Sequence, residues 1–235
     1  MDTAAHQLIA QRVYDALPRA AQDFVRASDV EIDFYARAPD VLYKDNLYTL
    51  SSCEGENHFH SYKIDWDRKA DTMTLITGSV HDALASESRV IHNAVIAGRF
   101  DEARLHLLQT GHYTVDACTL PHLTHELTPE QHGLFETQIA DYMAKEAKFP
   151  VEQQLLQHPA PLLLITRDLR GTTEAVCKET VRLQLDRVKA ALKAGKITDD
   201  VPLCQEIVAR CMGFTLAVWL FQWRICAKLS PGVEI

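Results

Sequence analysis

The chain has 235 residues, enough for one domain with a full hydrophobic core, and 47% of them are hydrophobic and 24% charged. This composition is typical of an ordinary globular protein. The formal net charge of -8 argues against a general nucleic-acid binder. The sequence also has no stripe of Lys and Arg residues that could bind along a phosphate backbone.

The cysteines indicate a reducing compartment. No Cys-x-x-Cys pair occurs among the six cysteines, at positions 53, 118, 177, 204, 211 and 226. This usage is typical of buried, reduced thiols.

Met1 is followed by a mixed polar segment rather than an apolar signal sequence. We therefore expect a cytoplasmic protein, or a secreted one if a leader was removed.

The first third of the chain combines one helix with a long irregular segment. Apolar residues at helical spacing predict a helix over residues 3–17, ended by Pro18. Residues 29–76 contain turn-like pairs such as Ala38-Pro39, and no helical stripe persists there. Because a loop of this length inside a compact domain is usually functional, we expect it to carry ligands.

Helical periodicity dominates the remaining two thirds. It predicts helices over residues 77–98, 100–117, 172–194 and 202–228. Thr128-Pro129-Glu130-Gln131 has the pattern of a capping box and starts a further helix that runs through Met143. Strand-like alternation is nearly absent, so the sequence predicts an all-α, compact multi-helix bundle, with residues 1–235 as a single domain.

The most apolar stretch, Met212–Trp223, is too short to span a bilayer and is flanked by Arg210 and Arg224. We therefore expect a buried helix and no transmembrane segment.

A run of potential metal ligands lies in the middle of the chain: His112-x3-Asp116-x5-His122-x9-His132-x3-Glu136. Residues four apart share one face of a helix, so each of the two spaced pairs is expected to point the same way. Imidazole and carboxylate without thiolate is the ligand set of a hydrolytic zinc site rather than a structural one.

The pattern resembles the zinc-dependent phospholipase C and P1/S1 nuclease superfamily. The positions that match its core motif are Gly111, His112, Tyr113, Asp116, Pro121 and His122, followed by the His-x3-Glu pair of His132 and Glu136. Further upstream, the positions that match a single N-terminal His, a loop Asp and a His before an aromatic residue are His6, Asp40 and His58. The resemblance covers roughly residues 1 to 140.

The resemblance implies two or three zinc ions. One ion would be bound by Asp40, His58, His112 and Asp116. A second ion would be bound by His122, His132 and Glu136. A third ion would be bound by His6, the other oxygen of Asp116 and the terminus at Met1. Asp40 would also be the general base or orienting carboxylate.

Two of these assignments have rivals in the sequence. His60 competes with His58, since the two flank the same aromatic residue. The upstream carboxylate could also come from the acidic residues Asp29, Asp33 and Asp45. Cys118 lies between two motif residues and is a weaker candidate ligand.

The resemblance implies metal-dependent phosphodiester hydrolysis, in which a hydroxide shared by the metals attacks phosphorus. Glu136 matches the phospholipases, whereas the nucleases have Asp there and a Gly-Gly-Asn loop that is missing after His122. We therefore expect a phospholipid or small phosphodiester as substrate and leave the identity of its headgroup open. Nucleic acid is the less expected substrate. A P1-like nuclease and a non-catalytic metal-binding protein are the alternatives.

Overall fold

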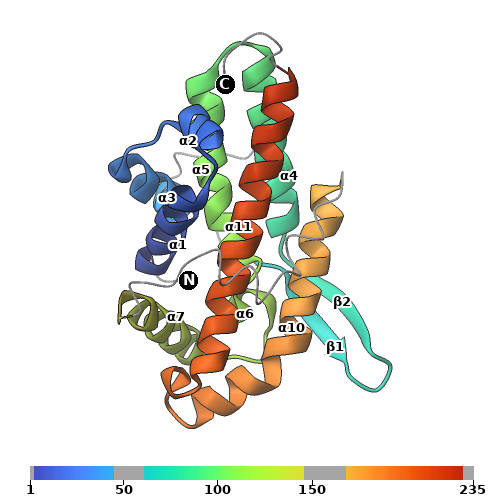
Figure 1. Ribbon diagram of the computed structural model, residues 1–235. Helices are drawn as coiled ribbons and strands as arrows, with labels where there is room; N and C mark the ends of the chain where they lie inside the picture. Colours follow the sequence, from blue (N-terminus) through green and yellow to red (C-terminus); the bar gives the residue numbers. More distant parts are fainter. Residues whose placement is uncertain (1–2, 45–60, 146–167, 230–235) are drawn as a thin grey trace.

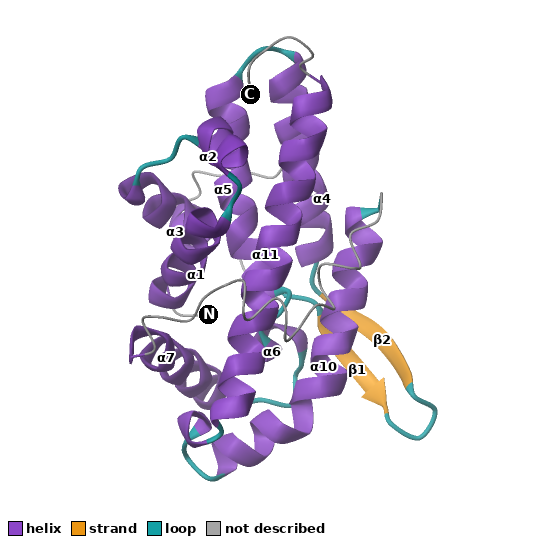
Figure 2. Cartoon of the chain, viewed as in Figure 1, coloured by secondary structure: helices purple, strands orange, loops and turns teal. Residues whose placement is uncertain are grey.

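The computed structural model describes residues 3–44, 61–145 and 168–229, and most of them are helical (Figures 1 and 2). The helices are α1 (Thr3–Ala16), α2 (Arg19–Val25), α3 (Asp29–Lys44), α4 (Val80–Ile96), α5 (Phe100–Asp116), α6 (Leu120–Leu123), α7 (Pro129–Lys145), α10 (Leu169–Lys193) and α11 (Val201–Leu229). A short 3-10 helix (Ile197–Asp199) joins α10 to α11. The all-α prediction is confirmed.

Six helices lie where periodicity predicted them: α1, α4, α5, α7, α10 and α11. The predicted capping box is also present. The backbone N–H of Thr128 donates to Gln131 Oε1 at 3.0 Å, and the backbone N–H of Gln131 faces Thr128 Oγ1 at 3.3 Å. These contacts satisfy donors that the first turn of α7 leaves without helical partners, so α7 begins at Pro129.

The prediction of an irregular segment over residues 29–76 is wrong at its start. Residues 29–44 form α3, although Pro39 lies inside this helix. A second capping box starts it, because the backbone N–H of Ser28 donates to Glu31 Oε2 at 2.9 Å. Ile32 and Ala36, one turn apart, bury their side chains in the core. The turn-like pair Ala38-Pro39 near the end of α3 led to the prediction of an irregular segment in place of this helix.

The same prediction also missed a β-hairpin. β1 (Lys63–Asp67) and β2 (Thr72–Thr77) pair antiparallel and form the sheet of the described residues. The hairpin projects from the side of the bundle (Figure 2). β2 is largely exposed, with no buried residue. The alternation of polar and apolar residues in β1, Lys63-Ile64-Asp65-Trp66-Asp67, is a strand signal that the prediction of an irregular segment missed.

The long helix α11 runs along most of the molecule, beside α4 and α5 (Figure 1). Within the described ranges it is the helix long and apolar enough to cross a membrane, and 83% of its most apolar window is buried inside the protein. The prediction of a buried helix over Met212–Trp223 is confirmed, since side chains such as Phe214 and Trp219 are fully buried.

A close contact between α5 and α11 fixes the part of α5 that precedes the first histidine of the motif. A Cβ atom at Gly111 would lie 3.1 Å from Cζ2 of Trp219, so glycine lets the indole approach the helix backbone. One turn further on, the hydroxyls of Thr114 and Thr215 lie 2.7 Å apart. These contacts hold α5 in register with the core helix.

Candidate metal centre

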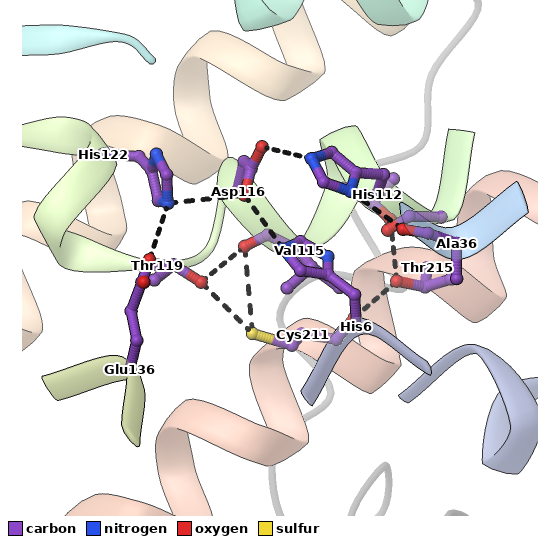
Figure 3. Close-up of polar contacts among 12 residues, drawn as sticks. His6, Ala36, His112, Val115, Asp116, Thr119, His122, Glu136, Cys211 and Thr215 are labelled. Atoms are coloured by element: carbon purple, nitrogen blue, oxygen red, sulfur yellow. Dashed lines mark hydrogen bonds and ion pairs between the residues drawn. The ribbon is translucent and has the colours of Figure 1, made fainter. Parts of the chain in front are cut away.

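Side chains from four helices converge on one region (Figure 3). It lies between the C-terminal end of α5, the short helix α6 and the N-terminal parts of α7 and α1. The helix α1 contributes His6, and α5 contributes His112 and Asp116. The short helix α6 carries His122, and α7 carries His132 and Glu136. They form two close groups, in each of which potential ligand atoms lie within 4.8 Å of one another: His6, His112 and Asp116, and then His122, His132 and Glu136.

The carboxylate of Asp116 is the centre of this arrangement, and only 1% of the residue is exposed. Its Oδ1 lies 3.4 Å from His6 Nε2 and 3.5 Å from His122 Nε2. Its Oδ2 lies 3.3 Å from His112 Nε2. Asp116 therefore joins the two groups, and His6 and His112 face different oxygens of one carboxylate.

The second group surrounds Oε1 of Glu136. That oxygen lies 2.7 Å from His132 Nε2 and 3.3 Å from His122 Nε2. The two imidazole rings are nearly perpendicular, with their centroids 4.9 Å apart. The ring of His122 thus lies between the carboxylates of Asp116 and Glu136 (Figure 3).

The orientation of His112 places two acceptors face to face. Its Nδ1 donates to the backbone carbonyl of Ala36 on α3 at 2.8 Å. In a neutral ring, Nε2 then carries a lone pair, which faces Oδ2 of Asp116 at 3.3 Å. Two acceptors at this distance need a proton or a cation between them. An imidazole held by a backbone carbonyl through its other nitrogen is also typical of metal-binding histidines.

The side chain of His6 also favours a bound cation. It is 1% exposed, and within the described part of the chain neither ring nitrogen makes a hydrogen bond, although Nε2 lies 3.4 Å from Asp116 Oδ1. Its ring stacks on that of His112, with centroids 4.0 Å apart and an interplanar angle of 8°. A buried imidazole without hydrogen bonds is costly, and a metal ion bound at Nε2 would remove part of that cost.

The imidazoles of His6 and His122 favour their neutral form. Burial lowers the pKa of His6 well below its ordinary value, and the neighbouring His112 lowers it further. Burial also lowers the pKa of His122 to about 4. Near neutral pH these rings are therefore in the form that coordinates a metal.

The carboxylates favour their ionised form. Burial acts to raise the pKa of Asp116, but the nearby imidazoles of His122 and His112 outweigh it and hold the pKa well below its ordinary value. Burial also acts to raise the pKa of Glu136, but hydrogen bonds from His122 and His132 outweigh burial and lower this pKa. Anionic oxygens beside neutral nitrogens form a donor set suited to a divalent cation.

The remaining predicted ligands have different outcomes. Asp40 lies in α3, one turn beyond Ala36, whose carbonyl contacts His112. The side chain of Asp40 is outside what the structure describes. Met1 and His58 lie outside the described residues, as do the rivals His60 and Asp45. Their assignment as ligands stays a prediction.

Three other candidates are absent from the two close groups found among the described residues. Asp29 is exposed at the start of α3, and Asp33 lies one turn further along. Cys118 is buried, with its thiol directed at the backbone carbonyl of Arg210 at 3.7 Å. Burial raises the pKa of the Cys118 thiol well above its ordinary value, which disfavours the thiolate that a metal would need.

Comparison with known proteins identifies the fold. No protein-family model and no curated protein sequence matches the chain. Alpha-toxin from an avian strain of Clostridium perfringens superposes with a TM-score of 0.60 and 14% identity, over 97% of this chain and 64% of the toxin chain. Alpha toxin from Clostridium absonum gives a TM-score of 0.57 and 16% identity, over 97% and 65%.

The chain therefore spans just under two thirds of the length of both toxins. At these identities the likeness shows the fold, which is that of the matched part of the toxin chains. This fold agrees with the all-α fold that the sequence predicted.

Proposed function

We propose that this protein is a zinc-dependent phosphodiester hydrolase of the phospholipase C type. The observation that carries the proposal is the buried carboxylate of Asp116, which three imidazoles from α1, α5 and α6 approach to within 3.3–3.5 Å. The fold adds support, since clostridial alpha-toxin is a zinc phospholipase C.

The residues present fit zinc ions on structural grounds. His6 is buried without hydrogen bonds, and the lone pair of a neutral His112 faces Asp116. The donors are imidazoles and carboxylates without thiolate, as in hydrolytic zinc sites. In this proposal His6, His112 and Asp116 hold zinc on one side, with Asp40, His58 and Met1 completing that side. The second group, His122, His132 and Glu136, holds a further ion.

The chain's own residues set the geometry of the reaction centre. Asp116 fixes the spacing between the two groups, because its Oδ1 faces both His6 and His122. Glu136 holds the rings of His122 and His132 at one oxygen. Bound zinc would acidify water near neutral pH and neutralise charge on a phosphodiester.

Asp40 is the general base or orienting carboxylate in this proposal. We expect Asp40→Asn to lower hydrolysis by at least about 100-fold, because general bases contribute about 10²- to 10⁴-fold. The zinc content should stay near that of the unmodified protein, since an amide oxygen still coordinates weakly. Steady-state hydrolysis and metal analysis of the same samples provide the measurement.

Asp33→Asn is the matched control for this substitution, since Asp33 lies on the same helix. It should keep its activity. Full activity in Asp40→Asn together with loss of activity in Asp33→Asn would transfer the role to Asp33.

A phospholipid or small phosphodiester is the proposed substrate class. A net charge of -8 gives a polyanion little attraction beyond the metal ions themselves. We expect zinc-loaded protein to hydrolyse bis-p-nitrophenyl phosphate or mixed phospholipid micelles faster than single-stranded DNA at the same zinc concentration. Faster turnover of DNA would favour a P1-like nuclease. No turnover of any substrate, with zinc bound, would favour a non-catalytic metal-binding protein.

A further inference from the structure

The short helix α6 cannot hold His122 in place by its own stability. It comprises four residues, Leu120–Leu123, far fewer than an isolated helix needs. The carbonyls of so short a helix also have few partners within it. Since His122 must face both Asp116 and Glu136, other parts of the chain have to fix the backbone of α6.

The start of the hairpin does this through consecutive residues. The backbone N–H of Tyr62 donates to the carbonyl of His122 at 3.0 Å. The ammonium group of Lys63 donates to the carbonyls of Pro121 at 2.5 Å and Thr124 at 2.9 Å. The carbonyls that Lys63 binds therefore lie on both sides of His122 in the chain.

The charge of Lys63 is partly desolvated and is satisfied by backbone carbonyls. Lys63 is half-buried, and burial lowers the pKa of its ammonium group, so desolvation acts against the charge. Within the described part of the chain, its hydrogen bonds go to these two backbone carbonyls rather than to a carboxylate. Hydrogen bonds from a charged donor are stronger than neutral ones, and a cation also suits the C-terminal end of a helix.

The hairpin is anchored at its far end as well. Arg68 pairs with Asp186 of α10 at 2.8 Å, and Asp71 pairs with Arg182 of the same helix at 3.2 Å. Lys63 thus stands on an element that α10 holds from outside the metal centre.

We propose that Lys63 is a positioning residue for His122, whose ammonium group fixes α6 so that the imidazole completes the group with His132 and Glu136. The inference rests on the proposed zinc function. Zinc ligands tolerate deviations of only about 0.2 Å. A small shift of α6 after loss of Lys63 therefore weakens this group, while His6 and His112, on α1 and α5, keep their positions.

The test measures zinc affinity by chelator competition in the unmodified full chain, Lys63→Met and Lys63→Arg. The ion held by the His122 group is identified as the one lost in His132→Ala. We expect Lys63→Met to weaken that ion by about 10- to 100-fold, as loss of a ligand's supporting partner does. The other zinc affinity should stay unchanged, and Lys63→Arg should restore binding, because a guanidinium donates to both carbonyls.

Lys189→Met is the matched control. Lys189 pairs with Glu126, close to Thr124 in the chain, through an exposed contact of 2.6 Å, and it should leave both affinities unchanged. If Lys63→Met does not fold, Lys63→Gln, which retains one donor group, replaces it and should show an intermediate loss.

The outcomes separate this inference from the proposed function. Zinc bound normally in Lys63→Met, or weakened equally at both groups, overturns the role of Lys63 and leaves the zinc function standing. Failure of both Lys63→Gln and Lys63→Arg to fold also overturns it, since Lys63 would then support the whole fold. An unmodified protein that binds no zinc removes both proposals.

Discussion

Asp116→Asn is expected to remove zinc from the group of His6, His112 and Asp116 and to abolish hydrolysis. The carboxylate is buried and faces three imidazoles through its two oxygens. An amide of nearly the same shape supplies one neutral oxygen and an NH2 group that cannot coordinate. Loss of an outer partner already costs about 10- to 100-fold in metal affinity, so loss of a shared anionic ligand should cost more. Elemental analysis and hydrolysis assays measure both effects.

Asp101→Asn is the matched control for that substitution. Asp101 lies on the same helix, with a side chain that is 91% exposed and pairs with Arg104. The control should bind zinc and hydrolyse substrate as the unmodified protein does. Normal zinc content in Asp116→Asn would mean that the carboxylate at the centre of the site is not a ligand.

His132→Ala is expected to remove one zinc ion and to lower the thermal stability of the zinc-loaded protein. The side chain of His132 is 34% exposed, so the substitution leaves no large cavity in the core. A ligand present at 1,000 times its dissociation constant stabilises the folded state by about 4 kcal/mol. For a domain of this size, each kcal/mol corresponds to about 2–4 °C in Tm. The Tm should therefore fall by roughly 8–16 °C in excess zinc and change little in chelator.

The comparison with His125→Ala makes this result specific. His125 is exposed in the loop between α6 and α7, and its loss should leave zinc content and Tm unchanged. An equal fall in the Tm of His132→Ala with zinc and with chelator would show a packing defect rather than a lost ion.

Local spacing allowed two of the three residues in each group to be predicted from the sequence. His112 and Asp116, and likewise His132 and Glu136, are separated by one helical turn, and their helices begin and end at recognisable signals. The side chains of each pair could therefore be expected to meet without knowledge of the tertiary structure.

Contacts between distant segments were harder to foresee. The resemblance to a known family, rather than any periodicity, linked His6 to Asp116. The ring stacking of His6 on His112 and the bond from His112 to the carbonyl of Ala36 depend on how α1, α3 and α5 pack. Nothing in the sequence around Lys63 indicated that its ammonium group would bind the backbone of α6.

The irregular segment predicted over residues 29–76 shows a different limit. Ile32 and Ala36 of α3 are buried whereas Val30 and Phe34 are exposed, and Pro39 near its end resembles a helix terminator. The strand β2 buries no side chain, so the hairpin depends on its pairing with β1 and on ion pairs to α10. The alternation of polar and apolar residues in β1 did signal a strand, and the sequence-based prediction missed it.

The zinc content of the purified protein tests the central claim most directly. Protein prepared without chelator, analysed for metals and then titrated with zinc, should contain two or three ions per chain, in line with two ligand groups that meet at the contact between Asp116 and His122. Its Tm should also rise on zinc addition. Less than one metal ion per chain, with no increase in bound zinc or in Tm when zinc is added, would contradict the account.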